Sequence, residues 1–332
     1  MTTGICAPAR RGVASPAVLQ FGDSPVSKCV DPVRGKCYNS RVMDIQRRDF
    51  ICLGAAGVAL AARTVRSATP IEQADFRYSL TRVNDVLAKE CARRGITITD
   101  WHIHLRGGMT AEMAAERERA SGIRSGVLEN HGREWPLCTN EILTAFIAEA
   151  KKPRVNGRPL PVGIQANDRD WYRQISPENR AALDYVLADT MIMGVGEDGK
   201  PQRLWLLKKP ITDADAWMKR YMAHNLQVLD EPISILANPT YLPTCLAGEY
   251  DRLWTDARMR EIIARAVAKG IALEVQAESP FPRARFFKLA KKMGAKFSFG
   301  TNNFNPKPKD LSRWLEVIDW LDLTGDDIWR PA

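Results

Sequence analysis

The feature that most constrains the fold is a pattern that repeats seven times between residues 96 and 303. Each repeat has a short apolar segment rich in β-branched residues, a polar turn and an amphipathic helix. The apolar segments predict strands at 96–105, 126–131, 160–167, 184–193, 233–239, 271–278 and 296–303. Several are apolar on both faces, as buried parallel strands are. The pattern therefore predicts an α/β fold with a parallel sheet.

The helices between these strands have recognisable ends, and one long segment interrupts the pattern. Thr110, Thr139 and the pair Ser176-Pro177 are residues that begin helices. Gly270 and Gly294 are placed where a left-handed residue ends a helix. Residues 194–212 are longer than a usual turn, and we expect this segment to form a lid or a wall of the pocket.

Polar residues gather at the carboxyl end of every predicted strand. An open sheet brings only the strands at its switch point beside a ligand, whereas the strand ends of a barrel all converge on one mouth. We therefore predict a distorted, TIM-like (β/α) barrel of seven strands. The polar residues expected at its mouth are Asp100, His102, His104, Glu129, Asn130, His131, Gln165, Asn167, Asp189, Asn238, Glu274, Gln276, Thr301, Asn302 and Asn303.

The first 68 residues lack this pattern and contain an export signal. "MDIQRRDFICLGAAGVALAART" joins a twin-arginine pair to an apolar run of thirteen residues, 50–62, which is too short to span a bilayer. Residues 43–68 are therefore predicted to be a twin-arginine signal peptide, with small residues near its end for processing. Because such a signal stands at the N-terminus, residues 1–42 are expected to be untranslated or disordered. The alternative is a short buried helix that follows two arginines.

This interpretation makes residues 69–332 a single barrel domain that the twin-arginine translocase delivers to the periplasm or the extracellular space. Residues 1–68 hold 10 of the 48 Lys and Arg residues but only 4 of the 39 acidic residues, so the remaining chain carries a net charge of +3. No cluster of basic and aromatic residues predicts a nucleic-acid partner. No later segment is long and apolar enough for a stable membrane span.

The stretch "TDWHIHLRGG" contains the clearest candidate for a metal site. Residues at i and i+2 on a strand share a face, so His102 and His104 can present imidazoles to one cation, with Asp100 on the same face. Glu129 or Glu274 is the alternative third ligand. The sequence thus predicts at most one divalent ion, Zn, Mn or Fe. The competing interpretation is that both imidazoles hydrogen-bond to neighbouring side chains or carbonyls and bind no metal.

The chain resembles the PHP (polymerase and histidinol phosphatase) superfamily. The resemblance is carried, in order, by "DWHIHL", "GVLENHG", "VGIQAN", "ILANPTYLP", "ALEVQ" and "KFSFGTNNFNP", which extend over nearly all of the chain after the signal. It implies a distorted seven-stranded (β/α) barrel that binds two or three divalent metals at its mouth and hydrolyses phosphoesters. Asp100, His102 and His104 match the family's first motif, and His131 matches the histidine of the second.

The other ligands that the resemblance implies are replaced. Asn130 stands for an aspartate, Gln165 for a glutamate, and Met191 and Asn238 for histidines. The final Ser-Asp-x-His motif reads Thr301, Asn302, Asn303 and Phe304. Amides keep the shape of carboxylates but lack the negative charge that offsets closely spaced dications. We therefore expect no cluster of several metals.

Other groups at the mouth offer functions that need no metal. Glu129 and Glu274, with His131, are candidate catalytic residues, and the two carboxyl groups could serve as acid and base. Arg106 and Arg133 are candidates for binding an anionic group, although surface ion pairs are their commoner role. The amides suit neutral polyhydroxylated ligands. They are Gln165, Asn167, Asn238, Gln276, Asn302 and Asn303.

The sequence thus favours an exported PHP-like hydrolase of a polar small molecule, either a phosphoester or a sugar derivative. The alternative is a catalytically silent barrel that binds a neutral polyhydroxylated ligand. The surroundings of the two histidines discriminate between these functions. An acid within hydrogen-bonding reach of His102 and His104 supports hydrolysis, whereas partners that are all amides favour binding.

Overall fold

The computed structural model describes residues 84–195 and 201–331, which all belong to one compact unit. The interpretations of residues 1–42 as untranslated and of residues 43–68 as a signal peptide concern residues outside these ranges. Within the described ranges, every helix is too short or too polar to cross a membrane.

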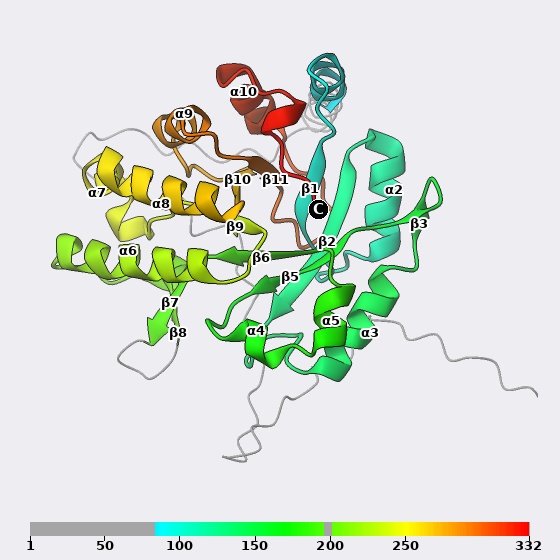
Figure 1. The fold of residues 1–332 in the computed structure, drawn as a ribbon, viewed down its shortest axis with the longest axis horizontal. Helices are drawn as coiled ribbons and strands as arrows, with labels where there is room; N and C mark the ends of the chain where they lie inside the picture. Colours follow the sequence, from blue (N-terminus) through cyan, green and yellow to red (C-terminus); the bar gives the residue numbers. More distant parts are fainter. Residues whose placement is uncertain (1–83, 196–200, 332) are drawn as a thin grey trace, which may run out of the picture. The chain divides into compact units, whose positions relative to one another are not determined.

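Seven parallel strands close into a barrel (Figure 1). They are β1 (Thr99–His104), β2 (Arg124–His131), β5 (Val162–Ala166), β6 (Tyr185–Asp189), β9 (Ile235–Ala237), β10 (Ala272–Gln276) and β11 (Phe297–Gly300). Each barrel strand pairs with the next one along the chain, and β11 closes the ring by pairing with β1. The predicted fold class, the number of strands and their approximate positions are confirmed.

The longer helices surround the barrel, one after most strands (Figure 1). They are α2 (Ala111–Ser121), α3 (Asn140–Ala150), α5 (Pro177–Ala182), α6 (Ala214–Asp230), α8 (Asp256–Lys269), α9 (Ala284–Lys292) and α10 (Ser312–Trp320). Shorter elements are α4 (Trp171–Gln174), α7 (Tyr250–Leu253) and the 3-10 turns η1 (Leu204–Leu206), η2 (Thr244–Glu249) and η3 (Gly325–Asp327). A two-stranded hairpin, β3 (Arg154–Val155) with β4 (Arg158–Pro159), was not predicted.

The predicted helix ends are confirmed by their hydrogen bonds and backbone angles. The hydroxyl of Thr110 accepts from the third backbone N–H of α2 at 3.2 Å, and that of Thr139 does the same for α3 at 3.3 Å. Ser176 caps α5 in the same way. Gly270 and Gly294 have φ of 68° and 78°, the left-handed conformation that glycine adopts without a steric cost.

The segment that interrupts the repeat, predicted at 194–212, contains a hairpin in its described residues. It pairs β7 (Ile192–Val195) with β8 (Pro201–Arg203). The guanidinium of Arg203 lies over the ring of Trp135, 4.9 Å from its centroid, and Trp135 belongs to the loop that follows β2. The hairpin after β6 therefore contacts a loop at the mouth side of the barrel. Its role as a lid or pocket wall stays a prediction.

An apolar layer fills part of the barrel interior. Its members are Trp101, Leu128, Tyr185, Leu187, Ile235, Ala237 and Ala272. Trp101 and Tyr185 pack edge to face, with ring centroids 5.0 Å apart. Glycines make room for these rings, because a Cβ at Gly163 would lie 2.7 Å from the Tyr185 ring and one at Gly126 2.8 Å from Trp101. The layer closes the barrel beneath the polar residues of the mouth.

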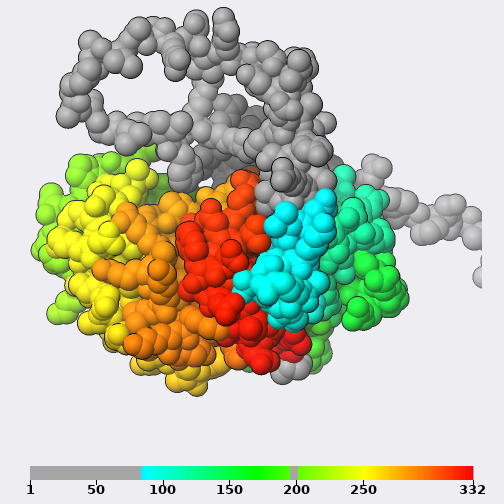
Figure 2. All heavy atoms as spheres, turned by 90° about the horizontal axis from the view of Figure 1, so that it is seen from above, coloured from blue at the N-terminus to red at the C-terminus, as the bar shows by residue number. Residues whose placement is uncertain are grey.

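The first and last described segments of the chain pack against each other. Figure 2 shows the residues near 84–100, in cyan, beside the red C-terminal residues. Arg94 forms an ion pair with Asp319 at 2.9 Å and another with Asp322, and its carbonyl accepts from Gly325. Trp329 donates its backbone N–H to Phe297 on β11 at 2.9 Å. These contacts hold the seam between β1 and β11.

We expect Gly163→Ala to lower the free energy of unfolding by about 1–3 kcal/mol, because the new methyl group overpacks the ring of Tyr185 inside the barrel. Gly248→Ala is the matched control, since a Cβ there meets nothing within 4 Å. Urea unfolding curves of the two variants measure the difference. Equal stability of both variants would contradict this account of the barrel interior.

Candidate functional site

A buried hydrogen-bond network centred on His102 crosses the barrel. Its Nδ1 lies 2.6 Å from Oε1 of Glu274 on β10, and its Nε2 lies 3.1 Å from Oε1 of Gln165 on β5. Gln165 donates from Nε2 to Asp189 at the end of β6, at 2.8 Å. The second carboxyl oxygen of Glu274 accepts from the backbone N–H of Asn238, after β9, at 3.0 Å. Side chains from β1, β5, β6 and β10 are thus fixed relative to one another.

The directions of these bonds favour a charged imidazole. Because the amide nitrogen of Gln165 faces Asp189, its oxygen faces His102, and Nε2 of His102 must donate. The carboxylate of Glu274 accepts from Nδ1, so both ring nitrogens carry protons. Burial alone would lower the pKa of His102, but the charge of Glu274 and its hydrogen bond raise the pKa above its usual value. The contacts of both ring nitrogens and the raised pKa thus both favour a buried imidazolium within the barrel.

A second histidine–carboxylate pair lies at the end of β1 and β2. Nδ1 of His104 is 3.3 Å from Oε1 of Glu129, an oxygen that also accepts from the backbone N–H of Asn130 at 2.7 Å. Nη1 of Arg106 lies 3.3 Å from the same oxygen. Burial opposes the charge of Glu129, but the hydrogen bond from His104 and the charge of Arg106 lower its pKa below the usual value.

His104 is neutral at pH 7, unlike His102. Burial, and after it the positive charge of Arg106, lowers the pKa of His104 to about 4. The ring then donates from Nδ1 to Glu129 and keeps a lone pair on Nε2. Among the described residues, none forms a hydrogen bond with this nitrogen. A neutral imidazole that is oriented by a carboxylate and has a free Nε2 is the arrangement of a general base.

Three buried polar atoms near the ends of β2 and β5 have no hydrogen-bond partner in the described part of the chain. They are Oε2 of Glu129, Nδ1 of His131 and Oδ1 of Asn167. His131 and Asn167 are neighbours, since the backbone N–H of Asn167 donates to the carbonyl of His131 at 3.1 Å. Burial lowers the pKa of His131 to about 4, so its ring is neutral. Buried polar atoms almost always have partners, so these atoms indicate a ligand or ordered water.

Asp100 does not lie with the two imidazoles as the i, i+2 rule suggested. Its Oδ1 accepts from the backbone N–H groups of His102, at 3.1 Å, and Thr301, at 2.9 Å, and its Oδ2 accepts from the Thr301 hydroxyl at 2.6 Å. The register between β1 and β2 shifts between Asp100 and Ile103, which breaks the regular alternation of side chains. Asp100 therefore ties β1 to the end of β11.

These contacts bear on the predicted metal ion. The rings of His102 and His104 are 5.2 Å apart between centroids, but both nitrogens of His102 already donate hydrogen bonds, and both oxygens of Asp100 accept them. In residues 84–195 and 201–331, no three His, Cys, Asp or Glu side chains have the arrangement of a metal site. The described residues thus do not fit the expected three-ligand site, and a bound metal stays a prediction.

The two predicted catalytic carboxylates bond to different histidines. Glu274 bonds to His102 and Glu129 to His104, and both oxygens of Glu274 have partners. Only Glu129 has a buried oxygen without a partner. A direct pairing of the two carboxyl groups as acid and base thus finds no support in these contacts.

The remaining predicted ligand-binding residues differ in their surroundings. Arg133 is exposed and forms ion pairs with Asp168, at 3.1 Å, and Asp170, and Asn303 holds the turn that follows β11 by bonding to the backbone of Asn305 and Lys307. No described residue hydrogen-bonds to the side-chain amides of three others, which therefore remain available. They are Asn238, Gln276 and Asn302.

Three residues at the mouth had no assigned role in the sequence-based site. Asp189 accepts from Gln165, and Thr301 donates to Asp100. Their positions at strand ends were the available signal. Phe304 is 46% exposed and lies under the guanidinium of Arg106, 5.9 Å from ring centroid to Cζ. An aromatic residue in the loop that follows a barrel strand could have suggested a ligand contact.

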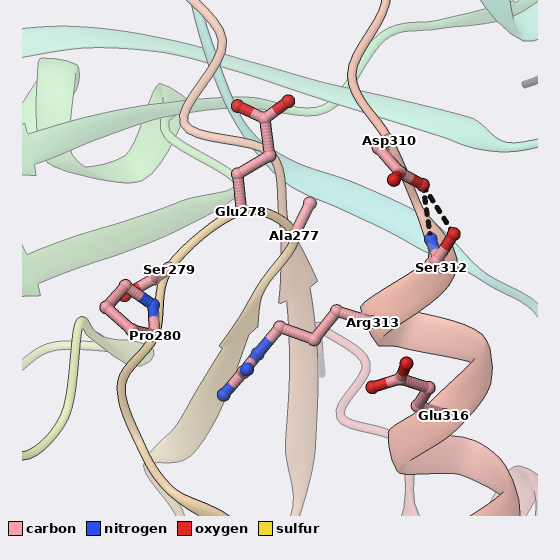
Figure 3. A pocket seen from close by; sticks show the side chains of 8 residues that line it. All are labelled: Ala277, Glu278, Ser279, Pro280, Asp310, Ser312, Arg313 and Glu316. Carbon is pink, nitrogen blue, oxygen red and sulfur yellow. Dashed lines mark hydrogen bonds between the residues drawn. The ribbon is translucent and has the colours of Figure 1, made fainter. Parts of the chain in front are cut away.

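A separate hollow of about 370 Å³ lies between the loop after β10 and the start of α10 (Figure 3). It is lined by Ala277, Glu278, Ser279, Pro280, Asp310, Ser312, Arg313 and Glu316. Figure 3 shows Asp310 bonded to Ser312, while Glu278 bonds to Lys309 at 2.5 Å. Because none of the histidines lines this hollow, the barrel mouth is the better candidate site.

Comparison of the sequence with protein-family models and with curated proteins finds no match. The geometry of the mouth is therefore the basis on which a function is proposed.

The four histidines of the chain provide a direct test of these protonation states. We expect ¹⁵N NMR spectra at pH 7 to show one imidazolium, His102, and three neutral rings, because burial lowers the pKa of His104, His131 and His224 to about 4. Glu274→Gln should leave His102 neutral, since it removes the charge that raises the pKa. A neutral His102 in the unmodified protein would contradict the assignment.

Proposed function

We propose that the chain is a hydrolase of a polar small molecule, in which His104 is the general base and Glu129 orients it. The observation that carries the proposal is the pair itself: a neutral imidazole held through Nδ1 by a buried carboxylate, with Nε2 free. Both histidines have an acid within hydrogen-bonding reach, which is the outcome that favours hydrolysis over simple binding.

The proposed reaction is an attack by water. Nε2 of His104 takes a proton from a water molecule, and the water oxygen forms a bond to the electrophilic centre of the substrate. The bond from that centre to the leaving oxygen breaks, and the imidazolium returns the proton to the leaving group. Glu129 accepts the Nδ1 hydrogen bond throughout and stabilises the transient imidazolium. Arg106 stabilises negative charge that develops near the mouth.

The other polar groups have roles in position and binding. The pair of His102 and Glu274 fixes β1 relative to β10, two residues before His104 on β1. His131 and Asn167 offer acceptor atoms to substrate hydroxyl groups. The amides without partners add donors and acceptors at the same mouth. This set suits a sugar derivative or a phosphoester, and the PHP-like motifs also suggest the phosphoester.

The second candidate function is binding without catalysis. The unpartnered acceptors of His131 and Asn167 would serve a neutral polyhydroxylated ligand equally well. In that case Glu129 and His104 would be ligand contacts. Export through the twin-arginine pathway to the periplasm or extracellular space is part of either proposal, and it depends on the arginine pair and apolar run of residues 43–68.

We expect His104→Gln and Glu129→Gln each to lower kcat/KM by about 10²–10⁴-fold, the usual contribution of a positioned base. Hydrolysis of 4-nitrophenyl phosphate, 4-nitrophenyl acetate and 4-nitrophenyl glycosides provides the assay. Arg133→Gln is the matched control, because its side chain is exposed and paired with Asp168 and Asp170. Binding of a polyol by a chain that hydrolyses no ester or glycoside would favour the second candidate.

The pH dependence of this activity follows from the pKa of His104. The base must be neutral, so kcat/KM should rise as the pH increases through about 4 and stay level near pH 6.5. If the base were a histidine with an unshifted pKa, kcat/KM would instead rise with pH around that pKa of about 6.5. A limb at the ordinary value would argue against His104 as the base.

The metal prediction can be tested by elemental analysis of the folded chain after incubation with Zn, Mn or Fe and dialysis. Since both nitrogens of His102 donate hydrogen bonds, we expect the unmodified chain to retain no more metal than His104→Ala. Near-stoichiometric metal that disappears in His104→Ala would instead establish a one-metal site and replace the proposed base chemistry.

A further inference from the structure

Arg106 is a cation at the mouth whose hydrogen-bond donors are unused. Its side chain is 28% exposed, and its one ion pair with a described residue is the 3.3 Å contact to Glu129. Its guanidinium forms no hydrogen bond with any residue in the described ranges. Arg133 differs, because its guanidinium already bonds to Asp168 and Asp170. Of the two arginines considered for anion binding, only Arg106 is available.

An exposed aromatic ring accompanies this cation. Phe304 lies under the guanidinium of Arg106 and is 46% exposed. A guanidinium placed over a ring, here with Cζ 5.9 Å from the centroid, interacts with the ring without using its N–H groups. The pair therefore presents an apolar surface directly beside a fork of donors that matches a carboxylate or a phosphate.

The backbone fixes this pair in position. A Cβ at Gly107 would lie 2.2 Å from the carbonyl oxygen of Phe304, and Gly107 has φ of 59°, so only glycine permits this contact between the two loops. The loop after β1 therefore touches the loop after β11. Because Arg106 directly precedes Gly107, the cation and the ring are held together before any ligand arrives.

The surrounding charge favours a single negative charge on the ligand. Oε1 of Glu129 lies 3.3 Å from Nη1 of Arg106. No other Lys or Arg in the described ranges forms an ion pair with Glu129. A ligand with two negative charges would be repelled by this carboxylate without a second cation to compensate. A carboxylate with one charge avoids most of that repulsion.

We propose that the mouth binds a ring-bearing organic carboxylate, whose carboxylate is held by Arg106 and whose ring lies on Phe304. This inference rests on the proposed function and narrows it, since it places a singly charged carboxylate, rather than a dianionic phosphate monoester, beside His104.

The test measures binding and needs no turnover. Isothermal titration of the full chain would compare benzoate with acetate, which lacks the ring, with benzamide, which lacks the charge, and with phenylphosphonate at pH 8.5, where it is a dianion. We expect benzoate to bind at least about tenfold more tightly than acetate or benzamide, because a charge-assisted bidentate bond and a contacting ring each contribute about that factor. We expect phenylphosphonate also to bind at least about tenfold more weakly than benzoate, because Glu129 repels its second negative charge. Comparable affinities for benzoate and acetate, or for benzoate and benzamide, would overturn the proposal.

Variants separate the two contacts. Arg106→Gln and Phe304→Ala should each weaken benzoate binding by about tenfold. Arg133→Gln and Trp320→Ala should not, because one removes a paired arginine and the other an exposed aromatic residue at the far end of α10. Equal losses in the control variants, or no benzoate binding by the unmodified chain, would contradict the inference. If His104→Gln abolished hydrolysis but still bound benzoate, catalysis would depend on His104 and the inferred ligand class would be supported independently.

Discussion

The buried ion pair between His102 and Glu274 is the interaction on which the mouth depends. It joins β1 to β10, and the amide of Gln165 extends it to Asp189 on β6. A charge this deeply buried is tolerated only when every polar atom around it has a partner, and here each ring nitrogen and each oxygen of Glu274 has one. Loss of one member would leave an uncompensated charge inside the barrel. The network therefore fixes the positions of the strand ends.

The same network gives the two histidines opposite properties although they are two residues apart. The charge of Glu274 and its hydrogen bond raise the pKa of His102 despite burial, whereas burial and the charge of Arg106 lower the pKa of His104 to about 4. Separate electrostatic environments of this kind assign different tasks to identical side chains. The first histidine contributes structure, and the second has a lone pair available for chemistry. The closed apolar layer beneath them keeps this polar region at one end of the barrel.

The sequence was sufficient for the fold because its period, helix caps and strand-end polar residues all favoured the same barrel. It also identified His102, His104, Glu129 and Glu274 as residues of one mouth. It could not tell which carboxylate meets which histidine, since the ends of parallel strands converge without revealing how far each side chain reaches. The register shift after Asp100 was also invisible, because strand periodicity assumes a regular ladder. That shift separates Asp100 from the imidazoles.

Gly107 has a consequence for how such a site can change. Its contact with the carbonyl of Phe304 involves no side chain on either loop, so the shape of the rim is set by backbone alone. Residues 106 and 304 can then be exchanged for others without altering the frame that presents them. A replacement of Gly107 itself would force the two loops apart and move both positions at once. Substitutions at residues 106 and 304 can therefore change which ligand is bound, while the backbone of the rim keeps the binding position unchanged.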